Sequence, residues 1–415
     1  MSNPDNTAAL PRHERMDQFP VVDNCLQVGG QPLPDVAASI GTPFYAYDGD
    51  VMTAQVGRLR AVLPPAVRLH YAIKANPMPP VARHLAGLTD GLDVASAGEL
   101  RIALATGTHP RNISFAGPGK SVEDLTLAVD SGVIINMESE QEMARIADLA
   151  GQAAPPPRVS IRVNPDFELK TAGMKMSSGP KPFGVDAERV PQMLDTLREL
   201  PLEFVGLHIF SGSQSLRADA IAAAHTQTFE LALRLAEHAP APVRWLNIGG
   251  GLGVPYFPGE QRLDLQPIAE NLSPLVAQAT EKLPGVEIVM ELGRYLVAEA
   301  GLYVCEVIDR KESRGEIFLI TNGGLHHHLA ASGNFGQVIR KNYPIVLGNR
   351  MAGPDLEEVN IVGPLCTPLD LLGSRVTLPR AEPGDLVAIF QSGAYGFSAS
   401  PRGFLSHPEA AEIFL

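Results

Sequence analysis

The chain has 415 residues, of which 45% are hydrophobic and 19% are charged, and its net charge is −13. This length favours two domains, and the composition is typical of a globular chain and excludes a disordered one. The acidic balance argues against a general nucleic-acid-binding protein, which needs a basic face.

Two further classes are excluded by the absence of their patterns. No apolar run approaches the length of a membrane span, and the polar start of the chain lacks a signal-peptide core, so we expect a cytoplasmic protein without membrane contact. The cysteines, Cys25, Cys305 and Cys366, lack the paired spacing of a disulfide framework or a zinc site.

Short strand-like runs alternate with helical patterns from residue 67 to residue 293. In chain order the runs are VRLHYAIK, GLDVAS, NISFAG, VIINME, RVSIRVN, FVGLHIF, VRWLNIGG and VEIVMELG. The stretches between them, such as AGELRIALATG, carry apolar residues at helical spacing and end at glycine. Strands and helices alternating over roughly 230 residues predict an α/β fold with a (β/α)8 barrel. A doubly wound open sheet is the alternative, but it usually has fewer parallel strands.

The two ends of the chain carry a different pattern. Beyond residue 298, runs such as LYVCEVIDRKESRGEIFLIT and GDLVAIFQSGAYG indicate strands separated by turns, and CLQVGGQPL and TPFYAYD near the N-terminus are also strand-like. We therefore expect a flexible tail over 1–18, N-terminal strands over 19–50 that join a β domain, the barrel over 51–297, and the C-terminal β domain over 298–415.

The predicted barrel strands end in residues of unusual chemical type. They are Lys74, Asp93, Arg162, His208, the run Gly249-Gly250-Gly251, Glu291 and Arg294. Because the functional residues of such barrels lie at the C-terminal strand ends, these side chains should share one mouth.

Taken singly, these residues allow structural interpretations. Lys74 could be a solvated strand end, His208 a core histidine, and the glycine run a permissive turn. The combination is more informative, because an amine nucleophile, a glycine loop that can cradle a phosphate, an imidazole and a carboxylate match the requirements of pyridoxal 5′-phosphate (PLP).

Seven motifs make this interpretation specific. YAIKANP, DVASAGE, HIFSGSQ, GGGLG, ELGRY, GPLCTPLD and GAYG follow one another between residues 71 and 396. With them the chain resembles the fold-type III PLP-dependent decarboxylases, the family of diaminopimelate, ornithine and arginine decarboxylases. The resemblance implies an alanine-racemase-like barrel with a β domain, a homodimer with shared active sites, and carboxy-lyase activity that removes the α-carboxylate of an amino acid.

The resemblance also implies a role for each motif residue. Lys74 would form a Schiff base with the cofactor, His208 would lie against the pyridine ring, and Glu291 would bond its nitrogen and keep the ring protonated, which favours electron withdrawal. Cys366 would act as the third catalytic residue beside Lys74 and His208, protonating Cα from across the dimer interface. The remaining cofactor ligands would be Ser211, Gly249, Gly250, Gly251, Arg294 and Tyr395 at the phosphate, with Asp93 and Arg162 supporting the ring.

The chain departs from the family pattern where the substrate's far end would bind. Thr367 follows Cys366, where diaminopimelate and ornithine decarboxylases usually carry an acidic residue, and the segment NGGLHHHLAASGNFG lacks the usual arginine. The third departure, ELGR in place of EPGR, is conservative. Loss of two polar contacts predicts a substrate whose far end is neither a free ammonium nor a free amino-acid head.

These departures resemble the branch that acts on amino acids tethered to an acyl carrier protein, which includes decarboxylases associated with exosortase clusters. Lys170, Lys175 and Lys181, in the basic loop KTAGMKMSSGPKPFG, could meet an acidic carrier, and Lys175 and Thr367 are the predicted substrate-binding residues. A solvated lid loop is the alternative.

Four other functions stay open at this point. They are a diaminopimelate decarboxylase acting on the free amino acid, a PLP-dependent racemase, a non-enzymatic PLP carrier, and a barrel binding module without PLP. Glu291 argues against the racemase, and residues 298–415 argue against the carrier. The consecutive histidines His326, His327 and His328 do not predict a metal site, because adjacent side chains point in different directions.

Overall fold

The computed structural model describes residues 12–151, 155–169, 173–175 and 179–415. The chain divides into two compact units. The barrel unit comprises Gly49–Val254 and Leu263–Val297, and the β unit comprises Met1–Asp48, Pro255–Arg262 and Ala298–Leu415. No helix of the described chain is both long enough and apolar enough to span a membrane.

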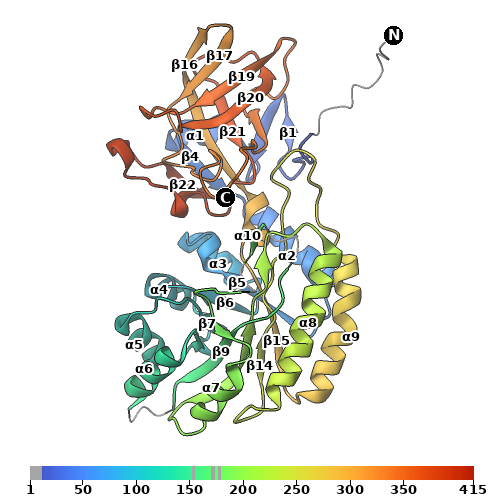
Figure 1. The fold of residues 1–415 in the computed structure, drawn as a ribbon. Coiled ribbons are helices and arrows are strands. Elements are labelled where there is room, and N and C mark those ends of the chain that lie inside the picture. The colour runs from blue at the N-terminus through green and yellow to red at the C-terminus, as the bar shows by residue number, and fades with distance from the viewer. Residues whose placement is uncertain (1–11, 152–154, 170–172, 176–178) are drawn as a thin grey trace. The chain divides into compact units, whose positions relative to one another are not determined.

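The barrel unit contains eight parallel strands that close on themselves (Figure 1). In order around the barrel they are β5 (Val67–Ala72), β6 (Gly91–Val94), β7 (Ile113–Phe115), β8 (Ile134–Met137), β9 (Arg158–Asn164), β12 (Glu203–Ile209), β14 (Trp245–Asn247) and β15 (Glu287–Leu292). Each strand pairs with the next, and β15 pairs with β5. The predicted (β/α)8 barrel is therefore confirmed, and each run proposed from the sequence overlaps one of its strands, although β12 begins one residue before the run FVGLHIF.

Short strands lie beyond the C-terminal strand ends. β10 (Met174–Lys175) pairs with β13 (Gly212–Ser213) in antiparallel fashion, and β11 (Val185–Asp186) extends the sheet beside β9. Four of the barrel strands contribute one residue each to a buried apolar cluster, which comprises Ile134, Val205, Trp245 and Val289.

Helices connect the strands of the barrel unit. They are α2 (Gly49–Val62), α3 (Pro79–Ala86), α4 (Ala97–Ala105), α5 (Val122–Ser131), α6 (Glu140–Ala150), α7 (Val190–Leu197), α8 (Ala218–Ala236), α9 (Gln266–Lys282) and α10 (Arg294–Val297), with short 3-10 turns at Ile73–Ala75 and Pro110–Asn112. Serines cap three of them, because the side chains of Ser96, Ser121 and Ser139 each accept a backbone N–H of the first turn. Helices α8 and α9 lie side by side (Figure 1).

The β unit is built around an eight-stranded sheet. Its strands are β4 (Phe44–Tyr47), β16 (Gly301–Ser313), β17 (Glu316–Thr321), β18 (Ile345–Leu347), β19 (Leu356–Val362), β20 (Leu371–Pro379), β21 (Leu386–Ile389) and β22 (Ala411–Phe414). Strand β4 pairs with β16 and β22, so a strand from the N-terminal region joins the C-terminal sheet. The 3-10 turns of this unit are Ala298–Ala300, Phe397–Ala399 and Phe404–Ser406.

The other N-terminal strands form a small sheet of their own. β1 (Val21–Val22), β2 (Cys25–Val28) and β3 (Gln31–Pro32) pair in antiparallel order and lead into α1 (Leu33–Ile40). Residues 12–18 belong to the predicted tail, yet the carbonyl of Arg12 accepts the Gly259 N–H at 2.8 Å and Asp17 pairs with Arg262 at 3.2 Å.

The consecutive histidines His326, His327 and His328 are buried and form part of the packed interior of the β unit. His327 Nε2 donates to the Pro408 carbonyl at 2.8 Å. His328 Nδ1 accepts the Ala331 N–H, so Nε2 carries the proton and donates to Ser392 Oγ at 2.9 Å. The two rings thus bind different parts of the unit, and the described residues hold no group of three or more potential metal ligands.

Acid should destabilise the barrel unit through His225, which lies buried in α8 with no hydrogen-bond partner for Nδ1 among the described residues. Burial lowers the pKa of His225 from 6.5 to about 4, so the folded state favours the neutral ring. The unfolded chain binds this proton first, and stability present above pH 6.5 is lost as the pH falls toward 4. We expect a contribution of about 1.4 kcal/mol per pH unit from this residue.

Urea denaturation at a series of pH values tests this expectation. The variant His225→Leu should show a shallower fall in the free energy of unfolding than the wild type. His238→Leu, in an exposed position just beyond the same helix, is the control and should keep the wild-type slope. Parallel curves for the wild type and His225→Leu would contradict the assignment.

Candidate active site

Lys74 projects from a turn that is fixed by its neighbours in the sequence. Strand β5 ends at Ala72, and Lys74 is the middle residue of the following 3-10 turn. The hydroxyl of the buried Tyr71 donates to the Asn76 carbonyl at 2.8 Å, and the Asn76 N–H donates to the Ile73 carbonyl at 3.0 Å. These bonds close the turn and leave the lysine side chain exposed at the strand end.

Strand register brings the other predicted residues to the same end of the barrel. Neighbouring strands place His208 beside both Arg162 and Asn247. Asp93 lies beside Ala72, the last residue of β5, and Glu291 lies beside His70 of the same strand. Because parallel strands present their C-terminal ends together, residues far apart in the sequence meet at one mouth.

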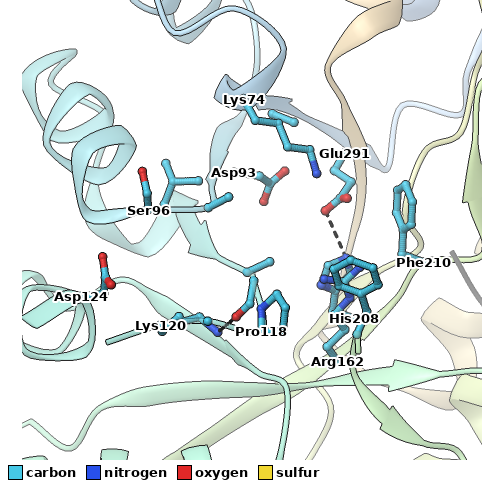
Figure 2. A pocket seen from close by; sticks show the side chains of 17 residues that line it. Lys74, Asp93, Ser96, Pro118, Lys120, Asp124, Arg162, His208, Phe210 and Glu291 are labelled. Carbon is cyan, nitrogen blue, oxygen red and sulfur yellow. Dashed lines mark hydrogen bonds and ion pairs between the residues drawn. The ribbon is translucent and has the colours of Figure 1, made fainter. Parts of the chain in front are cut away.

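This mouth contains a cavity of about 350 Å³, which is within the range of small-ligand sites. Five of the residues predicted from the sequence line it, and they are Lys74, Asp93, Arg162, His208 and Glu291. Figure 2 shows Lys74 and Glu291 directed toward the same space, with His208 and Phe210 beside them and Ser96 and Asp124 on the other side.

Glu291 is a buried carboxyl group whose surroundings favour its ionised form. His208 Nε2 lies 3.2 Å from Oε2, and Asn247 Nδ2 donates to the same oxygen at 2.9 Å. Burial alone would raise the pKa of Glu291, but the charges of His208, Lys74 and Arg162 hold it well below its ordinary value. The site therefore contains a fixed negative charge that a protonated heterocycle can use.

Asp93 forms the wall of the cavity on the β6 side. Its Oδ1 accepts the hydroxyl of Ser114 and lies 3.5 Å from His70 Nδ1. Its Oδ2 is buried and has no hydrogen-bond partner among the described residues. A buried carboxylate oxygen without a partner indicates that a ligand completes this site.

Arg162 is held by Glu138, the residue that follows β8. Arg162 Nη1 donates to Glu138 Oε1 at 2.8 Å, and the guanidinium lies 5.1 Å from the ring centroid of Phe183. Glu138 also accepts the backbone N–H groups of Gly117 at 2.6 Å and Gly184 at 2.8 Å. Burial would raise the pKa of Glu138, but Arg162 and Lys120 lower it below its ordinary value.

Lys120 is the second lysine among the residues that line the cavity. Its ammonium is buried and donates to the carbonyls of Gly117 and Asn136 and to Glu142, at 2.8, 2.9 and 2.8 Å. All three of its protons are thus used within the fold, which distinguishes it from Lys74.

The predicted phosphate ligands lie on the neighbouring strand ends but not among the residues that line the described cavity. Gly249-Gly250-Gly251 follows β14, Ser211 follows β12, and Arg294 begins α10 after β15. Gly249 and Gly251 have φ values of 72° and 81°, and a Cβ on Gly251 would stand 2.7 Å from the Gly212 carbonyl oxygen. The turn therefore requires glycine at these two positions, and a glycine turn that follows a strand is typical of phosphate-binding sites.

The remaining predicted residues belong to other parts of the chain. Cys366, Thr367 and Tyr395 lie in the β unit, where Cys366 is exposed and Thr367 lines a groove of about 520 Å³. Lys170 and the side chain of Lys175 lie outside the described residues, and Lys181 is partly exposed. Their approach to the barrel mouth stays a prediction.

Comparison with known proteins identifies the chemistry. Residues 50–298 match the family described as pyridoxal-dependent decarboxylase, pyridoxal binding domain. The chain belongs to this family. Family membership establishes PLP as the cofactor and amino-acid decarboxylation as the type of reaction.

The similarity to individual relatives extends over nearly the whole chain. The chain is 41% identical to L-glutamyl-[BtrI acyl-carrier protein] decarboxylase of Niallia circulans, over 90% of this chain and 88% of that one. It is 31% identical to diaminopimelate decarboxylase of Aquifex aeolicus, over 95% and 91%. The crystal structure of diaminopimelate decarboxylase from M. jannaschii with L-lysine has a TM-score of 0.87 at 25% identity, covering 96% of this chain and 93% of that one.

The residues of the mouth fit PLP. The exposed amine of Lys74, the buried carboxylate of Glu291 and the glycine-only turn are the chemical types that the aldehyde, the ring nitrogen and the phosphate of the cofactor would need. The decarboxylase family and the geometry of this chain thus agree on the ligand.

The sequence-based set lacks several residues of the site, among them Lys120, which lines the cavity, and Glu138 and Asn247, which bind residues that line it. Glu138 and Asn247 both stand at or directly after the end of a predicted strand, in VIINME and VRWLNIGG. The strand-end rule that selects Lys74 could have selected them as well. Their hydrogen-bond partners lie on other strands, however, and depend on a register that the motifs do not reveal.

Proposed function

We propose that this decarboxylase acts on an amino acid attached to an acyl carrier protein, with a glutamyl thioester as the substrate class. The single observation that carries the proposal is the 41% identity, over 90% of the chain, to a relative whose name specifies an L-glutamyl acyl-carrier-protein substrate. A decarboxylase acting on free diaminopimelate is the alternative, favoured by the 31% identity to the Aquifex aeolicus enzyme.

The residues after Cys366 support the tethered substrate. Thr367 carries no charge, and its Oγ1 accepts the Leu369 N–H at 3.3 Å. Asp370 is the next carboxylate in the sequence. Its two oxygens accept the N–H groups of Leu325 and Leu365 at 2.6 and 2.8 Å, so both are used in hydrogen bonds within the β unit. Neither side chain offers a free carboxylate to a substrate ammonium, whereas the enzymes for diaminopimelate and ornithine usually carry an acidic residue directly after the cysteine.

The mechanism assigns a task to each residue of the mouth. When bound, PLP supplies the electron-accepting ring that the loss of an α-carboxylate requires. Lys74 would hold the cofactor covalently, and the ionised Glu291 would keep a proton on the ring nitrogen. His208 would orient the ring, Gly249 to Gly251 would bind the phosphate, and Cys366 would deliver a proton to Cα of the product.

Comparison of substrates tests the proposal. Release of CO2 should be measured from a glutamyl-carrier thioester, a glutamyl thioester of N-acetylcysteamine, free glutamate, free diaminopimelate and free ornithine. We expect rapid release from the carrier-bound form, slower release from the small thioester because carrier contacts are lost, and little release from the free amino acids.

The other outcomes each have a meaning. Rapid release of CO2 from free diaminopimelate would contradict the tethered substrate and favour the alternative decarboxylase. Exchange of the α-proton without release of CO2 would favour a racemase. The homodimer with shared sites and the cytoplasmic location both stay predictions from the sequence.

A further inference from the structure

Asn247 joins two parts of the active site that the sequence motifs treat separately. It is the last residue of β14 and is completely buried. Its Nδ2 donates to Glu291 Oε2 at 2.9 Å, and its Oδ1 accepts the Gly249 N–H at 2.8 Å. The amide orientation is unambiguous, since a backbone N–H requires an acceptor and a carboxylate oxygen requires a donor.

A main-chain bond reinforces this connection. The Glu291 N–H donates to the Gly249 carbonyl at 2.9 Å, so Glu291 and Gly249 are joined both directly and through the Asn247 amide. His208 Nε2 also lies 3.2 Å from Oε2 (Figure 2). Asn247 and His208 therefore both lie against the same carboxylate oxygen.

The chemistry of the amide also acts on charge. A hydrogen bond donated to a carboxylate favours its ionised form, and in a buried position this effect is strong because water cannot replace the donor. A carboxylate at position 247 would reverse the effect, because two carboxylates at hydrogen-bond distance share a proton rather than both ionise.

We propose that Asn247 is a positioning residue for PLP, setting the glycine turn and the Glu291 carboxylate in one rigid unit that binds both ends of the cofactor. The proposal rests on the assignment of the glycine turn to the phosphate and of Glu291 to the ring nitrogen. Asn247 itself touches neither reacting atom, and it acts through Glu291 and Gly249.

Binding of cofactor analogues tests the proposal without any substrate. Asn247→Asp keeps an acceptor for Gly249 but replaces the amide donor to Glu291 with a carboxyl group that shares a proton with Glu291. PLP should therefore bind about 10- to 100-fold more weakly to the variant than to the wild type, since the shared proton reduces the negative charge on Glu291 that a protonated ring nitrogen needs. The 1-deaza analogue of PLP has no ring nitrogen, so the variant should bind it with nearly the affinity of the wild type.

Asn136→Asp provides a matched control. Asn136 is equally buried at the C-terminal part of β8, but its Oδ1 accepts the Ser160 hydroxyl and it does not line the described cavity. This variant should bind PLP and the deaza analogue as the wild type does. Circular dichroism of the cofactor-free proteins checks that each variant is folded.

The outcomes separate this inference from the site assignment. Failure of the wild type to bind PLP, or binding that leaves Lys74 unmodified after reduction, would overturn the site itself. A folded Asn247→Asp variant that loses PLP and the deaza analogue equally would overturn the positioning role. If Asn247→Asp does not fold, Asn247→Ser, which can make only one of the two bonds, carries the same comparison.

Discussion

Replacing Lys74 with alanine is expected to abolish covalent attachment of PLP and to lower kcat/KM for decarboxylation by about 1,000-fold or more. The reason is chemical, because the other lysine that lines the described cavity, Lys120, donates its three protons to Gly117, Asn136 and Glu142. Lys74 is exposed at the mouth and is the amine that a carbonyl compound can reach. Borohydride reduction followed by peptide mass spectrometry locates the attached cofactor.

The variant Lys74→Arg separates charge from chemistry. Arginine keeps the positive charge beside Glu291 but cannot form the covalent link, because its guanidinium stays protonated. We expect it to fail in the reduction experiment while remaining as well folded as the wild type. A phosphopyridoxyl group found on Lys120 in the wild type would contradict the assignment, because Lys120 would then have to leave its buried ion pair.

One physical reason explains why the sequence predicts both the barrel and the five predicted residues that line its cavity. Strand periodicity locates the end of each strand, and parallel strands in a barrel present these ends together, so the amino-acid sequence alone is enough to group Lys74, His208 and Glu291. The resemblance of the motifs to the decarboxylase family then identifies PLP as the expected cofactor. Neither argument requires knowledge of which side chains touch.

Contacts between strands are a different matter. The bonds of Asn247 to Glu291 and of Glu138 to Arg162 depend on register and on side-chain direction, which a single sequence does not encode in any local pattern. The small sheet β1–β3 is missed for a similar reason, since a strand-like run does not show which sheet it joins. Cys366 and Thr367 stand in the β unit, and their part in the site rests on resemblance.

Replacing Glu138 with alanine is expected to reduce the free energy of unfolding by about 3–5 kcal/mol, because Arg162 would remain buried without its partner. The carboxylate binds Arg162 and the N–H groups of Gly117 and Gly184, so three donors lose their acceptor at once. Urea denaturation of the cofactor-free protein measures the change. Loss of PLP affinity should accompany it, because Arg162 lines the cavity.

Glu140→Ala is the matched control for Glu138→Ala. Glu140 lies two residues further along and pairs with Arg189 at 2.7 Å, and the side chains of Glu140 and Arg189 are 40% and 62% exposed. Water and salt screen such a pair, so its loss should cost at most about 1 kcal/mol. The variant Glu138→Ala/Arg162→Met removes both buried charges and should recover much of the stability lost by Glu138→Ala, since the penalty arises from an unpaired ion. Equal destabilisation by Glu138→Ala and Glu140→Ala would instead show that the buried Glu138–Arg162 pair contributes no more to stability than an exposed ion pair does.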